Sequence, residues 1–279
     1  MPCGRRLVHI DDHPLKRLLR RLEQSAVLDE EDRRAVLALP YTLKSLDPST
    51  YIVREGDPPL QCGVLLSGFA FRQKLTGDGL RQIIAVHMPG DAMDFQNLFL
   101  DVADHSVQML TRGEVAFVAR RDFQALARSR AGVGHAILIN ILIDASIFRE
   151  WVLNVGRRDS RSRLAHVLCE FAVRLKAQGL APEYGYELPM TQEQLADALG
   201  LTPVHVNRVL KALEAEGLIS RNRRSVSFPD WERMRQVADF NERYLHLEPQ
   251  RQASGPSPAR QAACRPSSSS LPPVTSISR

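Results

Sequence analysis

The sequence is poor in cysteine, and the cysteines that it has lie far apart. Cys3, Cys62, Cys169 and Cys264 include no close pair. This spacing argues against a disulfide framework, a zinc site and the ferredoxin type of iron–sulfur cluster. The thiols are therefore expected to be reduced, as they are in cytoplasmic proteins.

Long apolar runs and a large excess of one charge are also missing. No apolar run approaches about 18 residues, and the N-terminus has no apolar stretch typical of a secretory signal. We therefore expect no membrane span and a cytoplasmic location. The net charge of +5 favours an anionic partner but does not by itself identify DNA.

Enzyme motifs are missing too. The sequence contains no nucleophile elbow, phosphate-binding loop, zinc-ligand spacing or paired carboxylates that a fold would bring together. We therefore expect the protein not to be an enzyme.

The chain is long enough for two domains and a tail. Its 279 residues are 44% hydrophobic and 25% charged, which is ordinary for a folded protein. We expect an α+β protein with lead-in helices (1–40), a β domain (41–130), a long helix (131–157), a C-terminal domain with an added helix (158–247) and a disordered tail (249–279). The tail is rich in serine, proline, glutamine and arginine and too poor in apolar residues to fold.

Short apolar runs separated by glycine turns fill the region from about Tyr41 to Arg120. The turns fall at Glu55-Gly56-Asp57, Ser67-Gly68, Thr76-Gly77-Asp78-Gly79 and Pro89-Gly90-Asp91, where glycine permits positive φ. Regularly spaced short strands of this kind indicate a barrel or jelly roll.

A helix without a breaker is predicted from Gly134 to Val155. It carries two apolar stripes at helical spacing. One stripe (Ile139, Ile143, Ile147, Trp151) is expected to pack on the β domain, and the other is expected to pair with a second subunit (Leu138, Ile141, Ala145, Phe148, Val152, Val155). The alternative is a helix buried entirely within one domain.

Two short helices with a tight turn are predicted from Thr191 onward. Thr191 and Gln194 have the spacing of a capping box, and Gly200 is suited to end the first helix in the left-handed conformation. Thr202 is expected to cap the second helix, with Pro203 at its first position. Helices this close must cross steeply, which is typical of a helix-turn-helix.

The outer face of the second helix suits contacts in a DNA major groove. It carries Val204, His205, Asn207, Arg208 and Lys211. The fork of Arg208 can bind guanine O6 and N7 together, while Lys211 is better placed for a phosphate. The alternative is an ordinary polar face of a surface helix.

Basic residues also lie before and after this motif. Beyond it, Leu218 to Phe228 predicts a hairpin whose basic tip includes Arg223 and contacts the DNA backbone. Before it, Asp159 is expected to cap a helix beside a basic run that is either solvated or in contact with phosphate (Arg157, Arg158, Arg161, Arg163). Residues 178–188 are expected to form a loop, and Asp230 to Leu247 a single added helix.

These residues resemble the Crp/Fnr family of transcription regulators. The stretch TQEQLADALGLTPVHVNRVLKALEAEGLI resembles the family's DNA-binding module, and the turns EGD, LLSG, TGDG and MPGD resemble its cyclic-nucleotide-binding-like β-roll. The resemblance spans most of residues 15–230. It implies that Arg208 is the guanine-reading arginine of the recognition helix. Val204 stands where many members carry glutamate, so the usual half-site is not carried over.

The resemblance does not extend to the family's known cofactors. Its cyclic-nucleotide-binding members carry Gly-Glu-Leu and Arg-Ser/Thr-Ala, where this chain has Asp94-Phe95-Gln96 and Ala103-Asp104-His105. Cyclic AMP is therefore not expected to bind. An iron–sulfur cluster is not expected because Cys3 alone cannot supply the N-terminal cysteine cluster. His87 or His105 with Cys62 could be axial ligands of a haem, but haem is not expected, because a lone histidine in a β domain is more often a surface or hydrogen-bonded core residue.

The sequence as a whole predicts a homodimeric, DNA-binding transcription regulator. It should bind a pseudo-palindromic operator on double-stranded DNA, with RNA polymerase as a further partner. The alternative is an effector-sensing signalling module whose C-terminal domain contacts protein. Whether an effector is sensed, and whether transcription is activated or repressed, is left open.

Overall fold

A computed structural model describes residues 13–182 and 185–247 of the protein. The first twelve residues, Cys3 and Cys264, and the tail predicted to be disordered from residue 249 onward lie outside the described residues.

Two short helices lead into the β domain. α1 (Lys16–Ser25) buries Leu18, Leu19 and Leu22, and α2 (Glu30–Leu37) begins at a capping box in which Asp29 and Asp32 bond each other's backbone N–H groups. Both helices contact the long helix α4 (Ala131–Arg157). The predicted lead-in helices are therefore part of the core rather than a loose extension.

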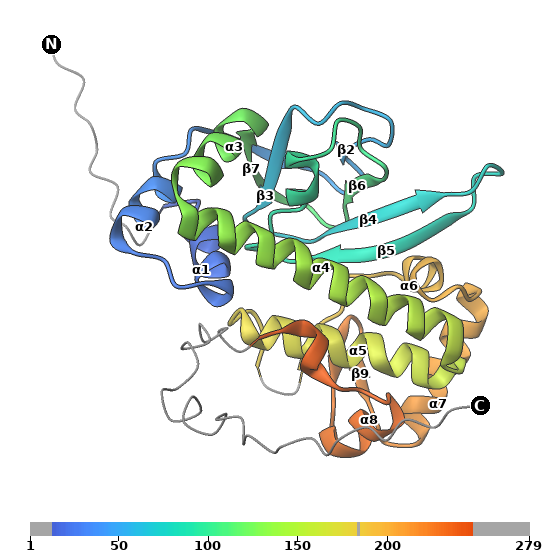
Figure 1. The fold of residues 1–279 in the computed structure, drawn as a ribbon. Helices are drawn as coiled ribbons and strands as arrows, with labels where there is room; N and C mark the ends of the chain where they lie inside the picture. Colours follow the sequence, from blue (N-terminus) through green and yellow to red (C-terminus); the bar gives the residue numbers. More distant parts are fainter. Residues whose placement is uncertain (1–12, 183–184, 248–279) are drawn as a thin grey trace, which may run out of the picture. The chain divides into compact units, whose positions relative to one another are not determined.

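Seven antiparallel strands form the β domain (Figure 1). Their hydrogen-bonded orders are β1-β7-β3 and β2-β6-β4-β5, and a core that includes Leu65, Val107, Met109 and Val115 draws on strands of both sheets. The strands are β1 (Tyr41–Leu46), β2 (Tyr51–Val53), β3 (Gln61–Leu65), β4 (Ala70–Leu75), β5 (Arg81–His87), β6 (Ser106–Met109) and β7 (Gly113–Ala119). A 3-10 helix, η2 (Phe95–Leu98), follows β5.

The predicted glycine turns are confirmed. Gly56, Gly68, Gly79 and Gly90 all have positive φ. At Gly68 the space is restricted as well, because a Cβ there would lie 2.6 Å from the carbonyl oxygen of Arg112. A side chain at this position would therefore push apart the two loops that close this end of the roll.

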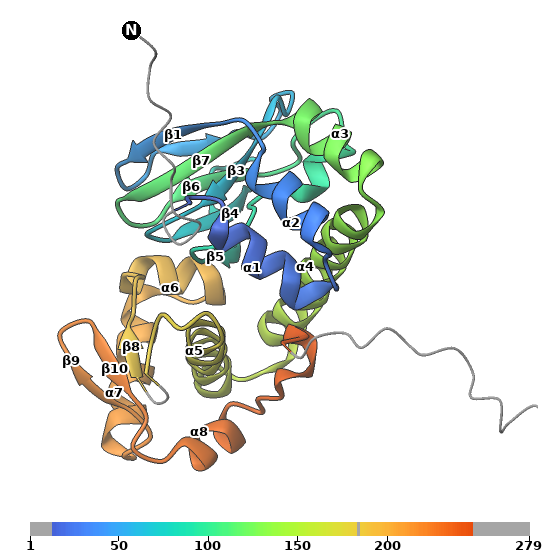
Figure 2. The same cartoon turned by 90° about the vertical axis from the view of Figure 1, so that its left-hand side faces the viewer.

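The long helix lies between the β-roll and the C-terminal module (Figures 1 and 2). α3 (Arg120–Ser129) precedes it, and α4 then runs for 27 residues. As predicted, its inner stripe packs inward: Ile143, Ile147 and Trp151 are buried in a cluster shared with β-roll and C-terminal residues. This cluster joins the two domains through the helix.

The C-terminal module is built around α5 (Ser160–Ala177), which buries ten of its residues. Asp159 caps α5, as predicted, by accepting hydrogen bonds from the backbone N–H groups of Arg161 and Ser162. The prediction of a simple loop for residues 178–188 is wrong. β8 (Gly185–Glu187) pairs with β10 (Ser225–Ser227), which pairs with β9 (Ser220–Asn222). Three residues are too few to show a strand periodicity in sequence.

The hairpin of β9 and β10 is called the wing below. The segment that follows it is not the single helix that the sequence predicts. α8 (Trp231–Val237) ends at Ala238, Asp239 has a left-handed φ of 47°, and a 3-10 helix η3 (Glu242–Leu245) follows. α8 packs on α5, whereas η3 packs on both α4 and α5. The segment has to bend because its apolar side chains, including Met234 and Leu245, are buried against different helices.

Candidate nucleic-acid interface

The two helices of the predicted motif begin and end as the sequence indicates. In α6 (Gln192–Leu199), the Thr191 hydroxyl accepts a hydrogen bond from Gln194 N, and Gln194 Oε1 accepts one from Thr191 N. Gly200 is left-handed, with a φ of 63°. α7 (Pro203–Ala215) starts from Thr202, whose hydroxyl accepts from His205 N. The hydroxyls of Thr191 and Thr202 therefore serve as caps.

The outer face of α7 is open. Val206, Val209, Leu210 and Leu213 are buried on the inner side. On the outer side Val204 is 81% exposed, and Arg208 and Lys211 are also exposed. Arg208 has no hydrogen bond or ion pair to any other residue that the structure describes. Its guanidinium is therefore available to a ligand, with both edges of its planar fork.

Two of the predicted contact residues are engaged within the chain. His205 is half-buried, and its Nε2 lies 2.9 Å from Ser160 Oγ at the start of α5. Asn207 Oδ1 accepts a long hydrogen bond, 3.5 Å, from Gln192 Nε2 of α6. Only the first of these contacts is short enough to hold its side chain firmly.

The wing forms a hairpin with a basic tip. Asn222 pairs with Ser225, so the tip consists of Arg223 and Arg224, which are both exposed. Arg223 adopts a φ of 55°, unusual for a residue with a side chain. Arg221 instead forms an ion pair with Glu214 of α7. The tip is therefore shorter than the four residues Arg221-Asn222-Arg223-Arg224 that the sequence predicts, because Arg221 and Asn222 belong to β9.

The basic run around the start of α5 corresponds to neither alternative that the sequence suggests. Arg157 is exposed, but Arg158 pairs with Glu150 at 2.7 Å, and Arg161 pairs with Glu216. Arg163 donates to the carbonyl oxygens of Leu199 and Arg158, at 2.7 and 3.0 Å. Three of the four arginines therefore bind the chain itself. Sequence alone could not reveal this, because the partners can lie far along the chain: Arg158 also donates to Asp239, which is 81 residues away.

Two families of known proteins match the two halves of this architecture. Residues 43–130 match the cyclic nucleotide-binding domain, and residues 162–237 match the Crp-like helix-turn-helix domain. The chain belongs to the Crp/Fnr family of transcription regulators. Members of this family are DNA-binding regulators and not enzymes.

Named Crp/Fnr relatives cover most of the chain. The transcriptional activator protein FnrL of Cereibacter sphaeroides is 27% identical over 214 residues, which are 75% of this chain and 85% of the relative. The nitrogen fixation regulation protein FixK of Rhizobium meliloti is 26% identical over 208 residues, which are 74% and 91% of the two chains. The solved structure of FixK2 from Bradyrhizobium japonicum is similar with a TM-score of 0.66 and 25% identity, covering 71% of this chain and 98% of that one.

One face of α4 is apolar and uncovered in the single chain. Three residues of the stripe that was predicted to pair with a second subunit are exposed (Leu138, Phe148, Val152). Leu142 and Leu153, which the sequence did not assign to that stripe, are exposed as well. Ile141 of the predicted stripe packs on the cluster around α1 and α3, and Ala145 and Val155 are half-buried. We call the five exposed residues the α4 stripe.

α4 is also long and apolar enough to cross a membrane, a property that the predicted absence of long apolar runs missed. Its most apolar 18-residue stretch has a mean hydropathy of 1.7 and is 33% buried. Core helices meet the same criterion, so this property is weak evidence for a membrane span. The runs in sequence are interrupted by Asn140, which donates to Ser25 Oγ of α1, and by Asp144, which accepts from Arg72 of β4.

In the β-roll, the residues that stand in place of the family's nucleotide-binding motifs pair with one another. Asp94 is 1% exposed, its Oδ1 lies 2.7 Å from His105 Nε2, and Asp104 holds the other nitrogen of the same ring at 2.7 Å. Arg72, from β4, pairs with Asp144 of α4 at 2.6 Å and lies 3.8 Å from Asp94. The sequence did not single out Arg72, because only the fold brings β4 beside these residues.

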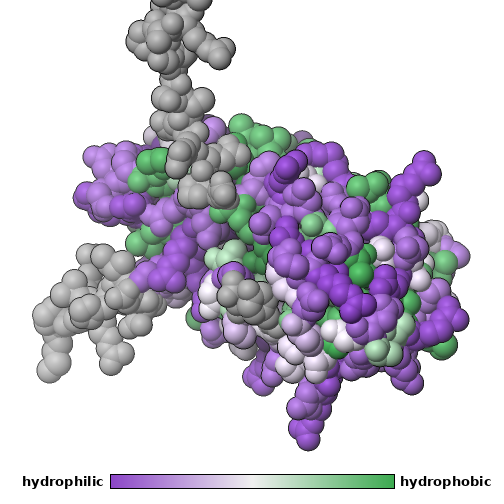
Figure 3. Space-filling model, turned by 90° about the horizontal axis from the view of Figure 1, so that it is seen from below, coloured by the Kyte–Doolittle hydropathy of each residue, from purple (hydrophilic) through white to green (hydrophobic). Residues whose placement is uncertain are grey.

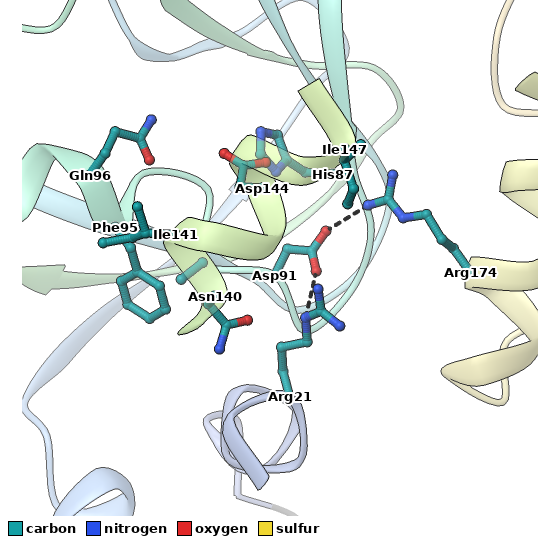
Figure 4. A pocket seen from close by; sticks show the side chains of 11 residues that line it. Arg21, His87, Asp91, Phe95, Gln96, Asn140, Ile141, Asp144, Ile147 and Arg174 are labelled. Atoms are coloured by element: carbon teal, nitrogen blue, oxygen red, sulfur yellow. Dashed lines mark hydrogen bonds and ion pairs between the residues drawn. The ribbon is translucent and has the colours of Figure 1, made fainter. Parts of the chain in front are cut away.

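The cavity between the β-roll and α4 is small. It measures about 40 Å³ and is lined by residues that include His87, Asp91, Asn140 and Asp144. Figure 4 shows Asp91 between Arg21 and Arg174, with which it forms ion pairs. Ligand pockets usually measure about 300–1,000 Å³, so this cavity has room for water but not for a nucleotide.

The candidate haem ligands are all buried. Cys62 is 1% exposed, and burial, followed by the nearby Asp94 carboxylate, raises the pKa of its thiol. Burial, and then Arg72, lowers the pKa of His87 to about 4, and its Nε2 has no hydrogen-bond partner. Both nitrogens of His105 are bonded to carboxylates. Among the described residues no group of three or more His, Cys, Asp or Glu side chains could hold a metal ion.

Proposed function

We propose that this protein is a homodimeric regulator that binds a pseudo-palindromic DNA operator and is not controlled by cyclic AMP. The observation that carries the proposal is the open outer face of α7, where Arg208 is exposed and has no partner among the described residues, while the apolar residues of the inner face are buried. An unpaired guanidinium on the exposed face of a recognition helix suits guanine in a major groove.

The surface around the module agrees with a DNA-binding role. The face seen in Figure 3 is covered mainly by hydrophilic side chains, with only scattered hydrophobic ones. We assign Arg208 to a guanine, Lys211 and Arg223 to phosphates, and Val204 to an apolar contact with a base edge. We also assign Thr191 and Thr202 to the DNA contact, because the first turns of α6 and α7, which they begin, have further backbone N–H groups that can donate to a phosphate.

The α4 stripe supports the dimer. Leu138, Leu142, Phe148, Val152 and Leu153 are between 45% and 57% exposed, and they lie along one helix. A contiguous apolar stripe of this kind needs a cover, and the same stripe of a second subunit provides one with two-fold symmetry. A two-fold dimer places its recognition helices in successive major grooves, roughly 34 Å apart.

The absence of cyclic AMP control is supported by the Asp94–His105–Asp104 cluster and the small cavity. Displacing the Asp94–His105 pair, in which both side chains are buried, would leave the Asp94 carboxylate without this partner, and an uncompensated buried charge costs several kcal/mol. We also propose that the protein carries neither haem nor an iron–sulfur cluster, acts in the cytoplasm and engages RNA polymerase.

The test is a selection of bound duplexes from a random DNA library, with the purified protein and with Arg208→Ala. We expect the natural protein to enrich a two-fold motif and Arg208→Ala to lose preference at one symmetric guanine, at a cost of about 1–3 kcal/mol per half-site. Affinity should also fall steeply with salt.

A motif without two-fold symmetry would refute the dimeric operator. Binding without sequence preference or salt dependence would favour the alternative of a module that contacts protein. Adding cyclic AMP should leave both the motif and the affinity unchanged.

A further inference from the structure

The first turn of α5 contacts the helix-turn-helix at three separate points. Ser160 meets His205 at the start of α7, Arg161 pairs with Glu216 at its C-cap, and Arg163 donates to the carbonyl oxygen of Leu199 at the end of α6. These contacts are made by residues only three positions apart in α5. They hold both ends of α7 and the turn between the helices.

The contact of Arg163 satisfies a group that the motif itself leaves open. The last carbonyl groups of a helix have no partner within it, and their partial negative charge favours a cation. Arg163 supplies that cation to α6, while its second nitrogen donates to Arg158 O at the C-cap of α4. The same arginine therefore joins the motif to the end of the long helix.

His205 differs from its neighbours on the outer face of α7. Val204 and Arg208 point away from the protein and are exposed, whereas His205 is half-buried with Nε2 at 2.9 Å from Ser160 Oγ. A ring nitrogen that is bonded to the chain is not available to a base edge. The contact joins the first turn of α7 to the first turn of α5.

We propose that His205 is a positioning residue: together with Ser160 it fixes the start of the recognition helix on α5, and it does not read a base. This inference rests on the proposed function and refines it by dividing the outer face. Val204 and Arg208 set the sequence preference, while His205 sets the angle at which α7 is presented. Because α5 follows directly on α4, the contact also links the presentation of α7 to the dimer helix.

The experiment compares His205→Ala, Ser160→Ala and the double variant for operator affinity and for base preference in the duplex selection. The loss of one hydrogen bond corresponds to roughly a five-fold change in an equilibrium constant, here the dissociation constant of the operator complex. We expect each single variant to weaken binding by about that factor on every duplex, with base preferences unchanged, and the double variant to be no weaker than the singles. Ser160→Thr keeps the hydroxyl, so this variant should bind the operator as tightly as the natural protein does.

The matched control is Ser162→Ala. Ser162 lies in the same turn of α5, and its hydroxyl has no hydrogen bond to another described residue. This variant should bind as the natural protein does. An altered preference at one base position in His205→Ala that Ser160→Ala does not share would overturn the proposal, as would additive effects in the double variant.

The same variants are also compared in urea unfolding, without DNA. The coupling between Ser160 and His205 should appear there too, and its absence would refute the contact. If the natural protein binds no duplex while the coupling in unfolding is present, the proposed function fails and the contact between α5 and α7 stands.

Discussion

The helix-turn-helix and the segment after the wing both consist of two short helical pieces, yet they are held in opposite ways. In the first, the residues that start and stop the helices lie within three or four positions of their partners: Thr191 with Gln194, and Thr202 with His205. In the second, Tyr244 donates to Glu170 at 2.8 Å and lies 3.1 Å from His166. Those partners are 74 and 78 residues away.

The difference explains which region sequence patterns can describe. A local capping motif forms from neighbouring residues and needs no knowledge of the fold. A buried carboxylate such as Glu170, which is 1% exposed, is stable only because Trp151, Arg174 and Tyr244 donate hydrogen bonds to it from three elements. The post-wing segment therefore takes its shape from α4 and α5 rather than from its own periodicity.

In the β-roll, Arg72, Asp94 and Asp144 form a cluster whose members come from distant parts of the chain. Breaking this cluster should have the largest effect on stability. Arg72→Met removes the cation beside Asp94 and Asp144, so that a carboxylate with 1% exposure loses its nearest positive charge. We expect a loss of about 3–5 kcal/mol in the free energy of unfolding, measured with urea. Arg112→Met, which breaks an exposed pair with Asp47, is the control and should cost less than about 1 kcal/mol. Equal effects of the two variants would contradict a structural role for the buried cluster.

The second prediction concerns pH. Burial, and then Arg158, lowers the pKa of His166 to about 4, whereas a histidine in an unfolded chain titrates near 6.5. The unfolded chain therefore takes up the proton first, so stability that is complete above about pH 6.5 is lost as the pH falls toward 4. His166 should contribute on the order of 2–3 kcal/mol to this loss.

The measurement is the free energy of unfolding between pH 7 and pH 4, for the natural protein and for His166→Gln. The variant should lose less stability over this interval. The remaining slope should include the contribution of His87, whose pKa is also lowered to about 4. An unchanged slope in His166→Gln would show that this histidine is not held neutral by the fold.

The smallest expected effects on stability come from two variants that compare the helix-turn-helix directly with the segment after the wing. Thr191→Ala removes a local cap, and Tyr244→Phe removes a long-range hydrogen bond; each should cost about 1 kcal/mol. Hydrogen exchange should separate them. Thr191→Ala should speed exchange in the first turn of α6 only, whereas Tyr244→Phe should speed it in α4, α5 and η3 together.

Tyr51→Phe provides the control for the loss of a phenol, because the Tyr51 hydroxyl has no hydrogen bond to another described residue. It should change stability by less than about 0.5 kcal/mol. Exchange confined to η3 in Tyr244→Phe would mean that this segment does not support the helices on which it packs.

The sequence by itself determined the elements whose signals are local. The caps Thr191, Thr202 and Asp159 and the left-handed Gly200 are all as predicted, because each depends on residues within one or two helical turns. The inner stripe of α4 could be predicted for the same reason. The family resemblance added the order of the domains.

The tertiary structure alone decided which polar side chains face one another. It turned three arginines around the start of α5 toward Glu150, Glu216 and Leu199 O, and it placed Arg72 beside Asp94. It also added β8 to the wing sheet and bent the post-wing segment at Asp239. Periodicity reports which face of an element is buried, but the partner of a buried charge depends on elements far away in the chain. Hence the sequence predicted the helix that presents Arg208, and only the fold showed that His205, three residues earlier, is held by α5.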